Sequence, residues 1–204
     1  MSIVSPDRPG RARPGRTLRE GLRKIAEAAV TPLELDDVLD VFHPLRGGVP
    51  GLRGRIVEVR PETAEAATLV IKPGKDWAGH RPGQYVRVGV DVDGVRMWRT
   101  YSLTHGPRAD GCISITVKAI PDGVVSSYLV HRARPGQLLQ LDQAQGEFVL
   151  PDPLPEKLLL VTAGSGITPV IGMLRNLSSR AEPAMAGPER IVLLHSALTR
   201  DSVI

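Results

Sequence analysis

Alternating apolar and polar positions dominate the middle of the chain. Six short segments there alternate or are rich in β-branched residues, which is typical of strands with one buried face. They are RGRIVEV (53–59), ATLVIK (67–72), QYVRVGV (84–90), RMWRTYSL (96–103), CISITVKA (112–119) and QLLQL (137–141). Turn-forming clusters such as PETAE, DVDG and ARPG separate them. We therefore predict a six-stranded antiparallel barrel over residues 52–152.

The pattern changes after residue 152. KLLLVTA (157–163) and RIVLLHSA (190–197) are continuous apolar runs, typical of strands buried on both faces of a parallel sheet. A helix is expected between them at 167–177, with Pro169 in its first turn. Residues 153–204 thus predict a partial Rossmann-like parallel α/β unit. A shorter helix, 126–133, begun by Ser126, is expected between the last two barrel strands.

The first 51 residues have a different pattern. Residues 1–16 are rich in Pro, Gly and Arg without periodicity, which predicts a disordered basic tail. Residues 17–51 predict a helical extension, because apolar residues recur at helical spacing from residue 18 to residue 29. The tail explains the pI of about 9.6, since most of the excess Arg and Lys lies in it.

Composition narrows the class of protein. The chain is 42% hydrophobic and 24% charged and has no apolar run near the roughly 18 residues that span a bilayer. Cys112 is the only cysteine, which excludes an internal disulfide and a four-cysteine iron–sulfur cluster within this chain. A lone cysteine fits a reducing compartment, so we expect a cytoplasmic location. No metal site is expected.

Three motifs carry candidate chemistry. RTYS (99–102) places Arg99 and Tyr101 on one strand face, taken to be the outer face of the barrel, where they could hold an anion and stack a flat ring. GVVSSYL (123–129) begins a helix whose first amides favour a phosphate. AGSGITP (163–169) repeats that arrangement after a strand, without the full GxGxxG spacing. Each motif alone also fits an ordinary surface pair, capped helix or turn.

Together with RPGQYV (81–86) and GEFVLP (146–151), these motifs make residues 52–204 resemble the ferredoxin–NADP reductase superfamily. The chain looks most like bacterial ferredoxin reductases and the reductase components of oxygenases or fatty-acid desaturases. In that family the barrel binds FAD and the following α/β domain binds NAD(P)H. The resemblance implies a hydride transfer from NAD(P)H to FAD, and then electron transfer to ferredoxin or another iron–sulfur acceptor.

The resemblance also implies roles for particular residues. Arg99 would contact the FAD diphosphate, Tyr101 would stack on the flavin ring, and Ser102 would lie near its reactive edge. Thr168 would lie between flavin and nicotinamide, so Ser102, Tyr101 and Thr168 are the expected catalytic residues. The remaining cofactor-binding residues that we expect are Lys118, Gly123, Val125, Ser126, Gly164, Ser165, Gly166, Ser196 and Arg200. NADPH or NADH, and FAD or FMN, remain alternatives, since Leu198 stands where relatives often have Arg.

The chain ends shortly after the second parallel strand, which predicts a C-terminally truncated nucleotide unit with exposed sheet edges and weak nicotinamide binding. Two other functions stay open. One is a truncated flavin-binding protein with little or no turnover. The other is a binding module whose basic tail contacts nucleic acid or a membrane surface. Nucleic acid is not expected, because no aromatic or folded reader accompanies the tail, whereas peripheral membrane contact stays open.

Overall fold

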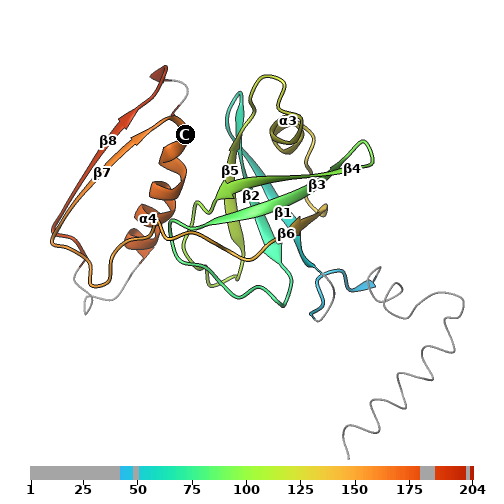
Figure 1. The fold of residues 1–204 in the computed structure, drawn as a ribbon, viewed down its shortest axis with the longest axis horizontal. Helices are drawn as coiled ribbons and strands as arrows, with labels where there is room; N and C mark the ends of the chain where they lie inside the picture. The colour runs from blue at the N-terminus through green and yellow to red at the C-terminus, as the bar shows by residue number, and fades with distance from the viewer. Residues whose placement is uncertain (1–41, 48–50, 180–186, 201–202) are drawn as a thin grey trace, which may run out of the picture. The chain divides into compact units, whose positions relative to one another are not determined.

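The computed structural model describes residues 42–47, 51–179, 187–200 and 203–204. The described residues from Leu45 onward belong to one compact unit, which contains both β-sheets (Figure 1). The expected basic tail (1–16) and nearly all of the expected helical extension (17–51) lie outside the described residues.

Six antiparallel strands form the larger part of this unit, as predicted. They are β1 (Leu52–Thr63), β2 (Ala66–Pro73), β3 (Tyr85–Val92), β4 (Val95–Ser102), β5 (Ile113–Lys118) and β6 (Leu138–Leu141). Their order in the sheet is β4-β3-β6-β1-β2-β5. A bridge between Leu103 and Ile115, directly after β4 and within β5, joins the two ends of this sheet and closes the barrel.

Local sequence explains where the strands begin and end. The hairpin between β3 and β4 turns on Asp93 and Gly94, whose φ angles of 50° and 79° are the left-handed values that a two-residue turn of this twist needs. β1 continues beyond the predicted end at residue 59 and runs to Thr63, so the PETAE turn was placed too early. A bulge between Pro61 and Thr63 lets the strand accommodate proline.

The barrel core is built from the inward positions that the alternation predicts. Its fully buried members come from α3 and from every barrel strand except β4, and include Ile56, Leu69, Ile71, Val86, Val88, Ile113, Ile115, Leu129, Leu139 and Leu141. The helix α3 (Val124–His131) contributes Val125 and Leu129 to this cluster. Burial of such side chains removes apolar area from water and is the main force that holds the sheet closed.

α3 begins two residues earlier than predicted. Gly123 is its N-cap, in an extended conformation, and no side chain caps the first amides. Ser126 was expected to cap the helix, but it lies inside the first turn, where its hydroxyl donates to the Gly123 carbonyl at 3.2 Å. The first N–H groups of the helix therefore stay available for a ligand.

The strand–helix–strand unit is confirmed. β7 (Lys157–Ala163) and β8 (Arg190–Ser196) pair in parallel, and the turn η1 (Gly164–Gly166) leads into α4 (Ile167–Ser179). The expected burial of both strand faces is wrong. Leu160 is buried, but Leu159 is 61% and Val161 69% exposed, because the described residues supply a helix against one face only.

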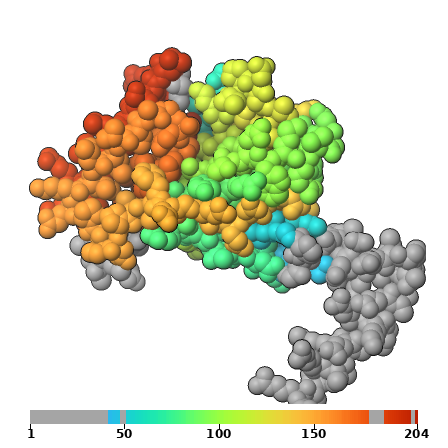
Figure 2. Space-filling model, viewed as in Figure 1, coloured from blue at the N-terminus to red at the C-terminus, as the bar shows by residue number. Residues whose placement is uncertain are grey.

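α4 also contacts the barrel. Ile167, Val170 and Met173 are buried, and the Arg175 guanidinium donates to the Thr104 carbonyl at 3.2 Å. A Cβ atom placed on Gly172 would overlap the Leu103 carbonyl oxygen, so glycine allows the helix to approach the barrel backbone. In Figure 2 the orange residues of this unit accordingly lie directly against the green barrel residues.

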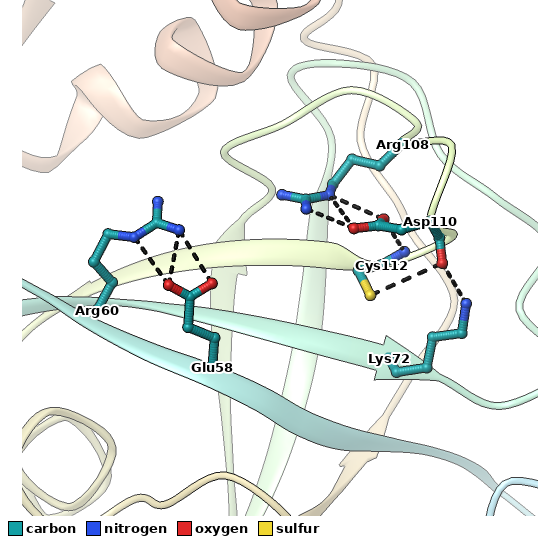
Figure 3. Close-up of polar contacts among 6 residues, drawn as sticks. All are labelled: Glu58, Arg60, Lys72, Arg108, Asp110 and Cys112. Carbon is teal, nitrogen blue, oxygen red and sulfur yellow. Dashed lines mark hydrogen bonds and ion pairs between the residues drawn. The ribbon is translucent and has the colours of Figure 1, made fainter.

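A loop between β4 and β5 is held by polar contacts (Figure 3). Arg108 pairs with Asp110, whose carboxylate also accepts the Cys112 amide at 2.8 Å, and Lys72 donates to the Asp110 carbonyl. These contacts hold the pKa of Asp110 well below its usual range. Burial and the nearby Asp110 raise the pKa of the Cys112 thiol, in keeping with a packed side chain. Glu58 and Arg60 form a separate exposed pair on β1.

Two features are absent from the described residues. None of the helices there has both the length and the apolar character to cross a bilayer. Within the same ranges, no group of three or more His, Cys, Asp or Glu side chains is placed to share a metal ion.

Replacement of Gly172 by alanine tests the close approach of α4. Gly172→Ala should lower the free energy of unfolding by about 1–3 kcal/mol, because the new methyl group must displace the Leu103 backbone. Gly187→Ala is the matched control, since a Cβ there meets open space. Chemical denaturation of both variants measures the difference, and equal stabilities would show that α4 does not pack as described.

Candidate cofactor site

One pocket of about 810 Å³ gathers most of the expected site residues. Its walls come from β4, β5, the turn before α3, the start of α3, η1, the start of α4 and the residues after β8. The expected residues that line it are Arg99, Tyr101, Ser102, Lys118, Gly123, Val125, Ser126, Gly164, Ser165, Gly166 and Thr168. Ser196 and Arg200 are exposed and are not among the described residues that line it. The volume falls within the range of small-molecule and cofactor sites.

The register of β4 corrects the expected orientation of Arg99 and Tyr101. Arg99 pairs with Val88 and Tyr101 with Val86, and directly opposed residues share a face of the sheet. Both valines are fully buried, so Arg99 and Tyr101 project from the core-facing side and not from the outer side. Because β4 is an end strand, this side opens into the pocket, where Arg99 is exposed.

Arg99 and Tyr101 differ in environment. The Arg99 guanidinium donates to the Trp98 carbonyl at 2.8 Å, which holds the side chain along the pocket wall. Tyr101 is half-buried and packs against the core. This burial raises the pKa of Tyr101 to about 12, although the positive charge of Arg99 acts in the opposite direction. A neutral ring beside an exposed cation suits a ligand with a flat aromatic part and a negative charge.

The start of α3 forms a second wall. A Cβ atom on Gly123 would overlap the Ile120 side chain and the Ser126 hydroxyl, so only glycine fits this turn. The uncapped start of the helix, residues 124–126, lines the same pocket as Lys118. The Lys118 ammonium lies 3.7 Å from a carboxylate oxygen of Glu65, and both side chains are largely exposed. Amides and ammonium together can hold a phosphate.

The turn η1 forms the third wall. Gly164 has a φ of 50°, and a Cβ atom placed on Gly164 or Gly166 would meet nothing within 4 Å. The backbone here is therefore open to a ligand that approaches closely, at the start of a helix whose dipole favours an anion. The Thr168 hydroxyl donates to the Ser165 carbonyl at 2.8 Å and stabilises this turn.

The ends of the parallel strands add His195. Thr162 and His195 are paired in the sheet, and the Thr162 hydroxyl lies 2.8 Å from the His195 Nδ1 atom. His195, Ala197 and Leu198 line the pocket, and Leu198 is 97% exposed. Ser196 and Arg200, which were expected to contact a cofactor, do not line the pocket as described, whereas their neighbours do.

The lining residues that were not predicted from the sequence include two polar ones, Thr116 and Asp122. Thr116 precedes Lys118 by two positions on β5, so alternation places both on one face, and this signal was present in the sequence. Asp122 lines the pocket from the turn before Gly123, in a left-handed conformation with a φ of 59°. Its carboxylate can accept hydrogen bonds from ligand hydroxyl groups. No pattern in the sequence distinguished it from an ordinary turn aspartate.

The raised pKa of Tyr101 predicts a pH dependence of stability in the ligand-free protein. Between pH 10 and about pH 12 the unfolded chain loses a phenol proton that the folded chain retains. This contribution is complete below pH 10 and is lost as the pH rises toward 12. Denaturant unfolding of the wild type and of Tyr101→Phe at pH 8 and pH 11 measures it. The wild type should lose more stability than the variant, and parallel losses would contradict the burial of the phenol.

The sequence of this chain is similar to those of known oxidoreductases. The model of the oxidoreductase FAD-binding domain matches residues 61–150. An NADPH oxidoreductase of Mycobacterium tuberculosis is 48% identical over 187 residues, which cover 90% of this chain and 48% of that protein. A flavohemoprotein of Pseudomonas aeruginosa is 36% identical over 140 residues, 67% of this chain and 35% of that protein. The chain thus spans about half the length of the first relative and about a third of the second.

Solved structures share the fold. A ferredoxin NADP+ reductase from Neisseria gonorrhoeae with bound FAD and NADP superposes with a TM-score of 0.63 at 24% identity. The match covers 76% of this chain and 61% of that one. This chain therefore shares the fold of a ferredoxin NADP+ reductase, and its residues 61–150 match the oxidoreductase FAD-binding domain.

Proposed function

We propose that this chain is the flavin- and nucleotide-binding part of an NAD(P)H-dependent reductase that passes electrons to an iron–sulfur acceptor. One observation carries the proposal. The strand with Arg99 and Tyr101, the uncapped start of α3 and the glycine turn η1 all open into the same pocket. A flavin dinucleotide and a nicotinamide dinucleotide need such adjacent sites for a flat ring and for phosphates.

The residues present fit FAD. Arg99, Lys118 and the first amides of α3 would supply positive charge and donors for a diphosphate, and Gly123 lets the turn before α3 pack against Ile120 and Ser126. Tyr101 supplies a flat surface for the ring, and Ser102, next to it, a hydroxyl at the ring edge. When bound, the flavin supplies the acceptor of a hydride and the donor of single electrons. The protein contributes orientation and charge, so no general base is required.

The glycine turn is the proposed nicotinamide-nucleotide side. Gly164, Ser165 and Gly166 would hold phosphates through their backbone, and Thr168 would lie between the two rings. Ser196 and Arg200 remain proposed contacts to the adenosine end, although they lie outside the pocket as described. We favour NADPH over NADH because a relative that is 48% identical is named an NADPH oxidoreductase. In domain terms, we assign residues 52–152 to flavin binding and residues 153–204 to the nucleotide.

The names of the similar proteins suggest two classes of electron acceptor. The shared fold includes a ferredoxin NADP+ reductase, which favours ferredoxin or another iron–sulfur protein. The flavohemoprotein of Pseudomonas aeruginosa offers haem as the alternative. Reduction of an added ferredoxin, compared with reduction of an added ferric haem protein, separates the two.

Arg99 should determine FAD affinity. Arg99→Gln removes a charged donor from the pocket and should weaken FAD binding about tenfold or more, as measured by quenching of flavin fluorescence. Arg96→Gln is the matched control, because Arg96 lies on the same strand but pairs with Asp91 outside the pocket. Equal affinities of the two variants, or a wild-type chain that takes up no FAD, would overturn the flavin assignment.

Gly166 should affect the nucleotide without affecting the flavin. Gly166→Val places a side chain in the open space of η1, so the NADPH concentration needed for half-maximal flavin reduction should rise roughly tenfold or more. FAD affinity should stay at the wild-type value. Anaerobic bleaching of the visible flavin band by NADPH measures the first, and quenching of flavin fluorescence the second. A yellow wild type that NADPH does not bleach would instead identify a flavin-binding protein with little turnover.

A further inference from the structure

The buried polar side chains of the described chain form one cluster. Thr68, Thr104, Ser114 and Thr116 are each at most 9% exposed. The hydroxyl oxygens of Thr68 and Thr116 lie 2.7 Å apart, those of Thr104 and Ser114 3.1 Å apart, and those of Thr116 and Thr104 3.4 Å apart. Buried hydroxyl groups are costly unless they are paired, and here each one has a partner.

Thr104 is the centre of this cluster. Its side chain is fully buried, and all three of its polar groups are used. The amide donates to the Ser114 carbonyl at 2.9 Å, the hydroxyl contacts Ser114 and Thr116, and the carbonyl accepts from Arg175 at 3.2 Å. One residue thus joins the end of β4, the strand β5 and the helix α4.

These three elements are also three walls of the pocket. Thr104 follows Ser102 by two residues on the chain that carries Arg99 and Tyr101. Its partner Thr116 lines the pocket on β5, two residues before Lys118. α4 begins directly after the glycine turn η1. Thr104 therefore contacts or adjoins three elements that line the pocket: the end of β4, β5 and α4.

We propose that Thr104 is a positioning residue, whose hydroxyl sets the spacing of β4 against β5 and so the seating of the flavin. This inference rests on the proposed function. The backbone bonds at Leu103 and Thr104 already close the barrel, so the hydroxyl is not needed for closure. A directional bond between side chains adds what apolar packing lacks, a fixed lateral and rotational relation between the two strands.

Thr104→Val and Thr104→Ser test the role of the hydroxyl. Valine keeps the shape and both backbone bonds but removes the hydroxyl, so the dissociation constant of FAD should rise about fivefold. The absorption spectrum and the midpoint potential of the bound flavin should shift with it. Serine keeps the hydroxyl, so in Thr104→Ser the dissociation constant, the spectrum and the midpoint potential should all stay at their wild-type values. Arg96→Gln again serves as the control, since Arg96 pairs with Asp91 outside the pocket.

The other outcomes overturn the proposal. If Thr104→Val lowers the melting temperature but leaves FAD affinity, spectrum and potential unchanged, Thr104 is structural only. If Thr104→Val does not fold, Ser114→Ala removes one hydroxyl partner of Thr104 from outside the pocket, and it must give the same flavin signature at smaller size. If FAD affinity, spectrum and potential are then unchanged in Ser114→Ala, the proposal is overturned. A wild-type chain without FAD refutes the proposed function itself, whereas normal FAD binding by all variants refutes only the role of Thr104.

The hydrogen bond from Arg175 to the Thr104 carbonyl can be tested separately from the hydroxyl. Arg175→Gln weakens the attachment of α4 but leaves the hydroxyl cluster intact. In Arg175→Gln we expect NADPH to reduce the flavin less efficiently, while FAD affinity stays at the wild-type value. In Thr104→Val, by contrast, FAD affinity is the quantity that should fall. Loss of FAD affinity in Arg175→Gln would show that the two arms of Thr104 are not independent, and would contradict the assignment of flavin seating to the hydroxyl.

Discussion

The contact between the end of β4 and β5 is the constraint on which the site depends. β4 and β5 are at opposite ends of the sheet order, and they meet through the Leu103–Ile115 bridge and the bonds of Thr104. Without this contact the sheet would be open, and Tyr101 would lose the half-buried position that raises the pKa of its phenol. α4 rests on the same two residues through Gly172 and Arg175. Barrel closure and the attachment of α4 therefore use the same two residues, Leu103 and Thr104.

Much of the fold follows from local patterns. Alternation located all six barrel strands, and the uninterrupted apolar runs located β7 and β8, because side-chain periodicity is a property of each segment alone. The predicted ends of the helices and strands were less accurate than their positions. Ser126 has the side chain of a helix cap, but the observed N-cap is Gly123, three residues earlier. A bulge carries β1 past Pro61. The burial of Leu159 and Val161 was predicted wrongly because burial depends on what packs outside the strand.

In the pocket, too, local motifs could be predicted, whereas features that depend on the packing of distant segments could not. Motifs with glycines or charged side chains, such as those at Arg99 and Gly164, are recognisable in the sequence, and the structure brings them to one cavity. The facing of Arg99 was predicted wrongly, since it depends on the register of β4 with Val88 and on the position of β4 at the end of the sheet. Thr104 carries no sequence signal at all. Its importance comes from segments that are distant along the chain and meet only after folding.

The loose pairing of Lys118 with Glu65 has a consequence for how an anion enters. At 3.7 Å and in contact with water, such a pair contributes little to the stability of the fold, so a phosphate can draw the ammonium away at almost no cost. Until then the carboxylate keeps the amine near the pocket mouth. In the proposed flavin site, Glu65 would be the counterion that a phosphate of the ligand replaces.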